Sequence, residues 1–189
     1  IMTALLVAES GMDLNTVVTV SNTAVNVPSG SSIMGLEAGD QITLIDLLYG
    51  LMLRSGNDAA CALAEAISGS VESFVELMNS RAAELGMNNT HFVNPHGFAD
   101  ETHYTTARDM AVLCCEYIKY ELLNIVAATS SYEVNLTSRD GTQKSFRMSN
   151  TNPLLTDSQY GDYVTGLKTG FTQRAGNCII IRYQREGRD

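Results

Sequence analysis

The segment "LMLRSGNDAACALAE", from Leu51 to Glu65, decides how the first half of the chain folds. Its flanks carry apolar residues at the three- and four-residue spacing of an amphipathic helix. Between them lies the polar run from Arg54 to Asp58, with Ser-Gly-Asn at its centre. Serine, glycine and asparagine favour turns and helix ends over helix interiors. The segment therefore predicts two helices that meet at residues 55–57.

Local signals place the other helices. Thr43 with Asp46, and Thr106 with Asp109, form capping boxes that predict helix starts. Gly86 lies where a C-terminal cap is expected. The apolar patterns then predict helices at residues 1–9, 43–54, 58–67, 70–86, 106–118 and 121–129.

The composition changes after residue 130. "SYEVNLT" and "KSFRMSN" flank "SRDGTQ", whose Asp140-Gly141 pair is typical of a β-hairpin. "NTVVTVS", "YVTGLKTGFT" and "NCIIIRY" have the composition of strands, whereas the segment after the first of them has the composition of a loop. We expect strands at residues 15–21, 131–137, 144–150, 163–172 and 177–183.

A helical block followed by antiparallel strands predicts a mixed α/β (α+β) fold. We expect one domain over residues 1–189, with a mainly helical lobe to about residue 130 and a β-rich part from about residue 131. "IMTALLVAE" opens without a cap residue, and "QREGRD" at the end has the composition of a turn between two strands. We therefore expect the domain to be incomplete at both ends.

The bulk composition excludes some classes of function. The chain has 189 residues, of which 44% are hydrophobic and 17% charged, and its formal net charge is −9. A packed core is expected, and the absence of a basic stripe argues against a nucleic-acid partner. No apolar run has the length of a membrane span, and no signal peptide is visible.

Neither cysteine nor histidine spacing predicts a metal site or a cofactor. Cys61, Cys114, Cys115 and Cys178 are expected to be small buried apolar residues, and no C-x-x-C pair occurs. The three histidines, His91, His96 and His103, lie in one loop at spacings that fit no familiar ligand pattern.

Two triplets could carry chemistry: Ser55-Gly56-Asn57 between two helices and Lys168-Thr169-Gly170 in a strand. Each alone is a weak signal, because short triplets arise by chance and Asn57 could simply cap the next helix. In this order and on these elements, they match the second and third motifs of the penicillin-recognising active-site serine enzymes. The pair of motifs therefore directs attention to that superfamily.

The surrounding sequence narrows the match. "LLYGLMLRSGNDAACALAE", "FVELMNSRAAELGMNNTHFVNPHGF", "HYTTARDMA" and "GLKTGFTQRAGNCII" resemble the serine-type D-alanyl-D-alanine carboxypeptidases, which are low-molecular-mass penicillin-binding proteins. The resemblance covers nearly the whole chain. It implies a β-lactamase/penicillin-binding-protein-like fold whose N-terminal strands are missing here.

The resemblance also implies a reaction. These enzymes remove the terminal D-Ala from peptidoglycan stem peptides through a serine acyl-enzyme, and β-lactams inhibit them covalently. Ser55 would relay a proton to the leaving group. Asn57 would hold the substrate amide or the family's first lysine. Lys168 would stabilise charge near Ser55 and attract the terminal carboxylate.

Three further residues would bind substrate. The Thr169 hydroxyl would contact the carboxylate or a carbonyl, and Gly170 would leave room for the substrate backbone. The backbone N–H of Phe171 would form half of the oxyanion hole. The implied partners are the stem peptide and β-lactams, and the implied location is extracytoplasmic. A membrane-associating segment, common in this family, would lie beyond Asp189.

One departure from the family matters most. No Ser-x-x-Lys occurs in residues 1–189, whereas in the family a run like "IMTALLVAE" directly follows that motif. We expect the nucleophile to lie just upstream of Ile1, so this stretch alone would be inactive. The alternatives are a non-catalytic peptidoglycan-binding protein, a D,D-endopeptidase and a β-lactamase. A β-lactamase would need a deacylating carboxylate. Asp157 and Asp162 precede the Lys-Thr-Gly strand, but their segment does not resemble the β-lactamase loop.

Overall fold

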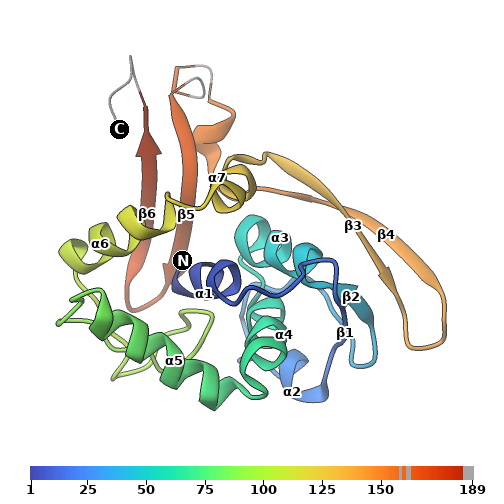
Figure 1. Ribbon diagram of the computed structural model, residues 1–189. Helices are drawn as coiled ribbons and strands as arrows, with labels where there is room; N and C mark the ends of the chain where they lie inside the picture. Colours follow the sequence, from blue (N-terminus) through green and yellow to red (C-terminus); the bar gives the residue numbers. More distant parts are fainter. Residues whose placement is uncertain (158, 161–162, 185–189) are drawn as a thin grey trace.

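A mainly helical part precedes a β-rich part along the chain in the computed structural model, which describes residues 1–157, 159–160 and 163–184 (Figure 1). The helices are α1 (Met2–Glu9), α2 (Asn22–Val25), α3 (Leu44–Arg54), α4 (Asn57–Ser68), α5 (Val71–Glu84), α6 (Ala107–Tyr117), α7 (Glu121–Ala128) and the 3₁₀ turn η1 (Pro153–Leu155). The strands are β1 (Val17–Thr19), β2 (Gln41–Thr43), β3 (Ser131–Thr137), β4 (Gln143–Ser149), β5 (Val164–Thr172) and β6 (Gly176–Tyr183). The turn predicted at the end of the chain lies mostly outside the described residues.

Side-chain caps begin three helices where the sequence predicts them. Thr43 Oγ1 accepts the N–H of Asp46 at 3.2 Å, and Thr106 Oγ1 accepts the N–H of Asp109 at 3.1 Å. Ser70 caps α5 in the same way. Gly86 follows α5 with a φ of +74°, which glycine adopts without the steric cost of a Cβ. These helix ends are confirmed.

Besides the 3₁₀ turn η1, two short elements were not predicted. Helix α2 lies in a segment expected to be loop, where Ser21 Oγ accepts the N–H of Ala24 at 2.9 Å. Strand β2 has only three residues, and it forms because it pairs with β1 on one side and β3 on the other. Neither element is long enough to leave a hydrophobic period in the sequence.

The strands form two antiparallel sheets. One has the order β1-β2-β3-β4, and the other consists of β5 and β6, with Lys168 opposite Ile180 and Gly170 opposite Cys178. Because β2 pairs with β3, the first sheet joins the mainly helical part of the chain to the β-rich part. Figure 1 shows the β3–β4 and β5–β6 hairpins on opposite sides of α3 and α7.

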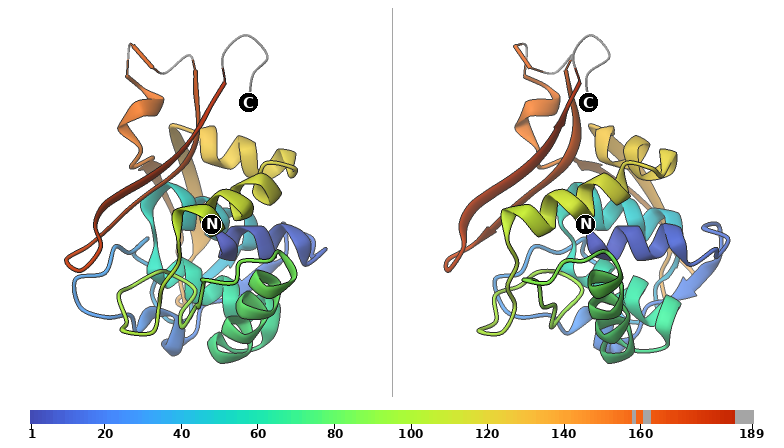
Figure 2. Two further views of the ribbon diagram at one scale, coloured as in Figure 1. Left: turned by 90° about the vertical axis from the view of Figure 1, so that its left-hand side faces the viewer. Right: turned by 60° about the vertical axis from the view of Figure 1, so that its left-hand side comes forward.

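Helix α1 lies in the centre of the core. It packs against α3, α4, α5, α6 and α7. A helix that is apolar on every side must be buried, and the apolar residues of α1 from Met2 to Val7 are at most 3% exposed. In both views of Figure 2, the N-terminal end of α1 faces the side on which the β5–β6 hairpin lies.

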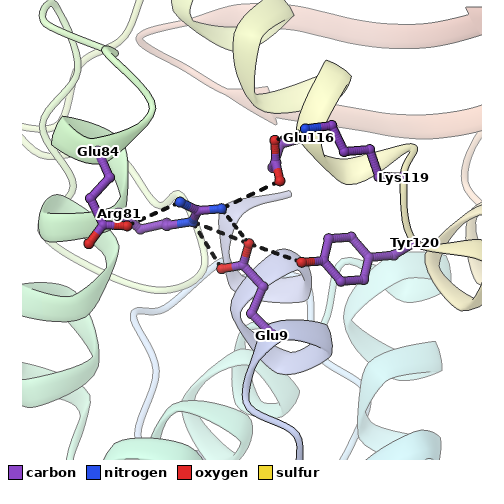
Figure 3. Close-up of polar contacts among 6 residues, drawn as sticks. All are labelled: Glu9, Arg81, Glu84, Glu116, Lys119 and Tyr120. Atoms are coloured by element: carbon purple, nitrogen blue, oxygen red, sulfur yellow. Dashed lines mark hydrogen bonds and ion pairs between the residues drawn. The ribbon is translucent and has the colours of Figure 1, made fainter.

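An ion-pair network holds the other end of α1 (Figure 3). Glu9 Oε1 accepts from Arg81 Nη2 at 2.7 Å, and Glu9 Oε2 accepts from Arg81 Nε at 3.0 Å. The Tyr120 hydroxyl donates to Glu9 at 3.3 Å, and Arg81 also contacts Glu116 at 3.5 Å. The Arg81 and Glu9 side chains are only 22% and 19% exposed, so solvent screens their bidentate pair less than it would a surface pair. The network fixes the last turn of α1 against α5 and the α6–α7 connection.

Candidate active site

A cavity of about 730 Å³ opens between the helical block and the β5–β6 hairpin. Segments far apart in the sequence form its walls: the first turn of α1, the loop between α2 and β2, the α3–α4 junction, the 92–98 loop, the segment from Thr151 to Pro153, and strands β5 and β6. All six residues predicted to act in a site line this cavity: Ser55, Asn57, Lys168, Thr169, Gly170 and Phe171. The structure therefore brings the two triplets to one place.

Ser55 ends α3 in an unusual backbone conformation. Its φ of +55° is the only positive φ among the described residues other than glycine. A left-handed conformation costs a non-glycine residue roughly 1–2 kcal/mol, and such strain tends to occur at functional sites. The turn lets Gly56 begin α4 at once, and it leaves the Ser55 side chain facing β5 across the cavity.

Lys168 reaches Ser55 from β5. Its Nζ donates a hydrogen bond to Ser55 Oγ and a second, of 2.9 Å, to the carbonyl oxygen of Thr169. Burial lowers the pKa of the Lys168 amine to about 8, because the charged form is poorly hydrated there. Ser55 and Lys168 thus form a hydrogen-bonded hydroxyl–amine pair whose proton can move near neutral pH.

This pKa predicts an alkaline limit to the reactivity of the site. Below about pH 8 the Lys168 side chain is positively charged, and above it the charge is lost. In the full-length protein, we expect the rate of acylation by benzylpenicillin to fall as the pH rises through about 8. The measurement is that rate, followed by mass spectrometry from pH 6 to pH 10. Lys168→Arg keeps its charge over this range, so an unchanged alkaline limit in that variant would contradict the assignment.

Asn57 is held in place by the loop between α2 and β2. Its Nδ2 donates to Ser31 Oγ at 2.9 Å, and its backbone N–H donates to the Ser32 carbonyl at 2.9 Å. The alternative interpretation, that Asn57 caps α4, is wrong because Gly56 is the N-cap and makes no side-chain cap bond. Ser31 was not foreseen, since it belongs to a loop without a recognisable motif.

Asp58 fastens the same loop over the start of α4. Its carboxylate is 2% exposed and accepts the N–H groups of Met34, Gly35 and Leu36 at 2.8–3.1 Å. Sequence analysis missed this role, because an acidic residue in the first turn of a helix is ordinary. The sequence of the loop did offer a signal. The loop is rich in glycine and serine, and its backbone N–H groups need an acceptor elsewhere in the protein.

The rest of the Lys-Thr-Gly strand also faces the cavity. Thr169 Oγ1 lies 2.7 Å from Thr151 Oγ1. A Cβ built on Gly170 would meet nothing within 4 Å, so this part of the cavity is open space beside the strand. Phe171 is 67% exposed and pairs with Asn177 across the hairpin. The oxyanion role of its N–H stays a prediction.

Two histidines line the wall formed by the 92–98 loop and its neighbours. Burial lowers the pKa of His96 to about 4, and burial also lowers the pKa of His103. Each Nδ1 accepts a backbone N–H, from Phe98 at 3.1 Å and from Val93 at 3.3 Å. Both rings are therefore neutral at pH 7 and serve as fixed parts of the loop.

The cysteines differ in part from the prediction. Cys61 is buried and Cys114 is half-buried, but Cys115 and Cys178 are exposed, and Cys178 lines the cavity. The prediction was wrong for these two cysteines because an apolar sequence pattern does not tell whether another element packs over that face of the helix or strand. In the described part of the chain, no group of three or more His, Cys, Asp or Glu side chains could hold a metal ion. Within the same residues, no helix is both long and apolar enough to cross a bilayer.

Comparison with known proteins identifies the family. The sequence profile of the D-alanyl-D-alanine carboxypeptidases matches residues 1–189. The chain belongs to this family. The D-alanyl-D-alanine carboxypeptidase DacF of Bacillus subtilis is 45% identical over 150 residues, which are 79% of this chain and 37% of that protein. The chain thus spans a little over a third of the length of that curated relative.

A relative closer in length to this chain, and relatives of known structure, support the same family assignment. The D-alanyl-D-alanine carboxypeptidase of Streptomyces sp. K15 is 35% identical and covers 100% of this chain and 67% of its own length. The crystal structure of the Streptomyces K15 DD-transpeptidase superposes with a TM-score of 0.88 at 32% identity, over 98% of this chain and 75% of that one. The D-alanyl-D-alanine carboxypeptidase DacD of Francisella tularensis gives 0.85 at 28% identity, over 98% and 55%. The predicted family and the penicillin-binding-protein-like fold are confirmed.

Proposed function

We propose that the full-length protein is a D-alanyl-D-alanine carboxypeptidase that removes the terminal D-Ala from peptidoglycan stem peptides. The observation that carries the proposal is the hydrogen bond between Lys168 and Ser55 in a cavity that Asn57 also lines. A serine hydroxyl beside an amine with a pKa of about 8 can pass a proton near neutral pH. Family membership supplies the reaction that this pair would serve.

The serine nucleophile is expected from the Ser-x-x-Lys motif of the family, placed directly before Ile1. The position of Ile1, Met2 and Thr3 in the cavity wall supports this placement, because residues just upstream would lie close to Ser55 and Lys168. In acylation, the serine oxygen bonds to the penultimate D-Ala carbonyl carbon, and the peptide C–N bond breaks. The proton released by the nucleophilic serine passes to the lysine of its motif and then through Ser55 to the departing D-Ala nitrogen. Water then cleaves the ester and regenerates the serine.

The other residues of the site would bind the substrate and stabilise the charge that develops on it. Lys168 would balance charge at Ser55 and attract the substrate carboxylate, and Thr169 would bind that carboxylate. Asn57, held by Ser31, would present its amide oxygen to the substrate. Gly170 would let the substrate backbone lie along β5, and the Phe171 N–H would stabilise the oxyanion.

The geometry gives less support to a β-lactamase. Among the described residues that line the cavity, none is an aspartate or glutamate, and Asp157 is not part of that wall. Asp162, the other carboxylate considered, lies outside the described residues. A carboxylate that would activate water for rapid deacylation therefore has no candidate in the described wall. We propose β-lactams as covalent inhibitors, an extracytoplasmic location, and membrane association through a segment beyond Asp189.

The test uses the full-length protein and two measurements. Intact-mass spectrometry after incubation with benzylpenicillin is expected to show one covalent adduct. A peptide that ends in D-Ala-D-Ala is expected to release free D-Ala. The matched control replaces the serine of the upstream motif with alanine, which should abolish both signals. A wild-type protein that binds such peptides without an adduct or D-Ala release would instead be a non-catalytic peptidoglycan-binding protein.

A further inference from the structure

Thr151 lies in the cavity wall on a segment that is fixed from both sides. The Asn150 side chain donates to the carbonyls of Ala127 and Thr129 at 3.3 and 3.0 Å, and its oxygen accepts the N–H of Asn152 at 2.9 Å. The Thr151 N–H donates to the Leu53 carbonyl at 3.1 Å, near the end of the helix that delivers Ser55. These bonds leave the Thr151 backbone little freedom, so its side chain has a set position.

The Thr151 side chain meets the Lys-Thr-Gly strand. Its Oγ1 lies 2.7 Å from Thr169 Oγ1, and both residues line the cavity. One hydroxyl of such a pair must donate to the other. If Thr151 donates, the Thr169 proton is free to point into the cavity, and a hydroxyl that already accepts a hydrogen bond is a stronger donor.

An anion in the cavity needs that donor. Lys168 is the one charged side chain among the described residues that line the wall, because the two histidines there are neutral at pH 7. An ammonium group has three N–H donors, and Lys168 already gives one to Ser55 and one to the Thr169 carbonyl. A carboxylate beside Lys168 therefore needs at least one more donor, and the Thr169 hydroxyl is within the same strand.

We propose that Thr151 is a positioning residue, whose hydroxyl bond to Thr169 directs the Thr169 proton toward the terminal carboxylate of the stem peptide. This role rests on the proposed carboxypeptidase function. Thr151 itself does not take part in bond making or breaking. Its loss weakens recognition of the carboxylate and spares the acyl-transfer chemistry.

The test compares two substrates in the full-length protein. One is a peptide ending in D-Ala-D-Ala with a free carboxylate, and the other is the same peptide with a C-terminal amide. Thr151→Val keeps the branched shape and removes the hydroxyl. We expect it to lower kcat/KM for the acid about 10-fold, mainly through KM, and to leave kcat/KM for the amide unchanged.

Two further variants separate positioning from a structural effect. Thr151→Ser restores the hydroxyl and is expected to return kcat/KM for the acid to within about twofold of wild type. Thr137→Val removes a hydroxyl of β3 that accepts a hydrogen bond from Gln143 and lies outside the cavity wall, so it should change kcat/KM for neither substrate. An equal loss for acid and amide, or no loss for the acid, overturns the role of Thr151 while the function stands. A wild-type protein that releases no D-Ala overturns both.

Discussion

Replacing Lys168 with methionine in the full-length protein is expected to slow acylation by benzylpenicillin about 1,000-fold. Methionine keeps the length of the side chain but removes the cation that donates to Ser55 and that we propose attracts the substrate carboxylate. The Ser55 hydroxyl then loses its charged partner, so proton transfer to the leaving group has no balancing charge. The measurement is the second-order rate of adduct formation by intact-mass spectrometry.

Lys144→Met is the matched control for this variant. Lys144 contacts Glu37 at 3.6 Å on the β3–β4 hairpin, and its side chain is 45% exposed, so the change leaves the cavity untouched. We expect a wild-type rate. Retention of more than about a tenth of that rate by Lys168→Met would contradict the central role that we assign to Lys168 in acylation.

Replacing Asp58 with alanine is expected to lower the free energy of unfolding by about 4 kcal/mol. The buried carboxylate accepts three loop N–H groups, and without it these donors lose their partner inside the protein. The loop from Ser31 to Leu36 then detaches from α4, and Asn57 loses its hold through Ser31. Chemical denaturation gives the free energy, and the acylation rate should fall as well.

Asp13→Ala tests whether the effect belongs to the buried position. Asp13 is exposed, and its carboxylate accepts only from Asn15, so the expected loss is about 0.5 kcal/mol. Equal destabilisation by the two variants would contradict the anchoring role of Asp58. Asp58→Asn is expected to fall between wild type and Asp58→Ala, because one oxygen acceptor remains.

The sequence could predict elements whose signals are local. Thr43, Ser70 and Thr106 each satisfy backbone donors within the next turn, so a short stretch of sequence contains the whole interaction. Strand β2 could not be found in this way, because its stability comes from partners far along the chain. Helix ends that depend on nearby residues were therefore predicted, whereas a strand that depends on distant residues was missed.

The candidate site follows the same distinction. Ser55 and Lys168 were found because a family motif marks them, and the structure places them in hydrogen-bonding contact. Ser31, Asp58 and Thr151 carry no motif, and their importance depends on which groups the fold brings beside them. The polar Asn150–Asn152 segment before a proline could have drawn attention to Thr151, but not to its partner.

The bond between Lys168 and Ser55 joins residues 113 positions apart. Contacts of such long sequence separation require much of the chain to be ordered before they stabilise anything, so they form late in folding. Partly folded molecules would have helices and hairpins but no assembled cavity. Under the proposed function, covalent labelling by a fluorescent penicillin would count only fully native molecules, which would make it a reporter of refolding yield.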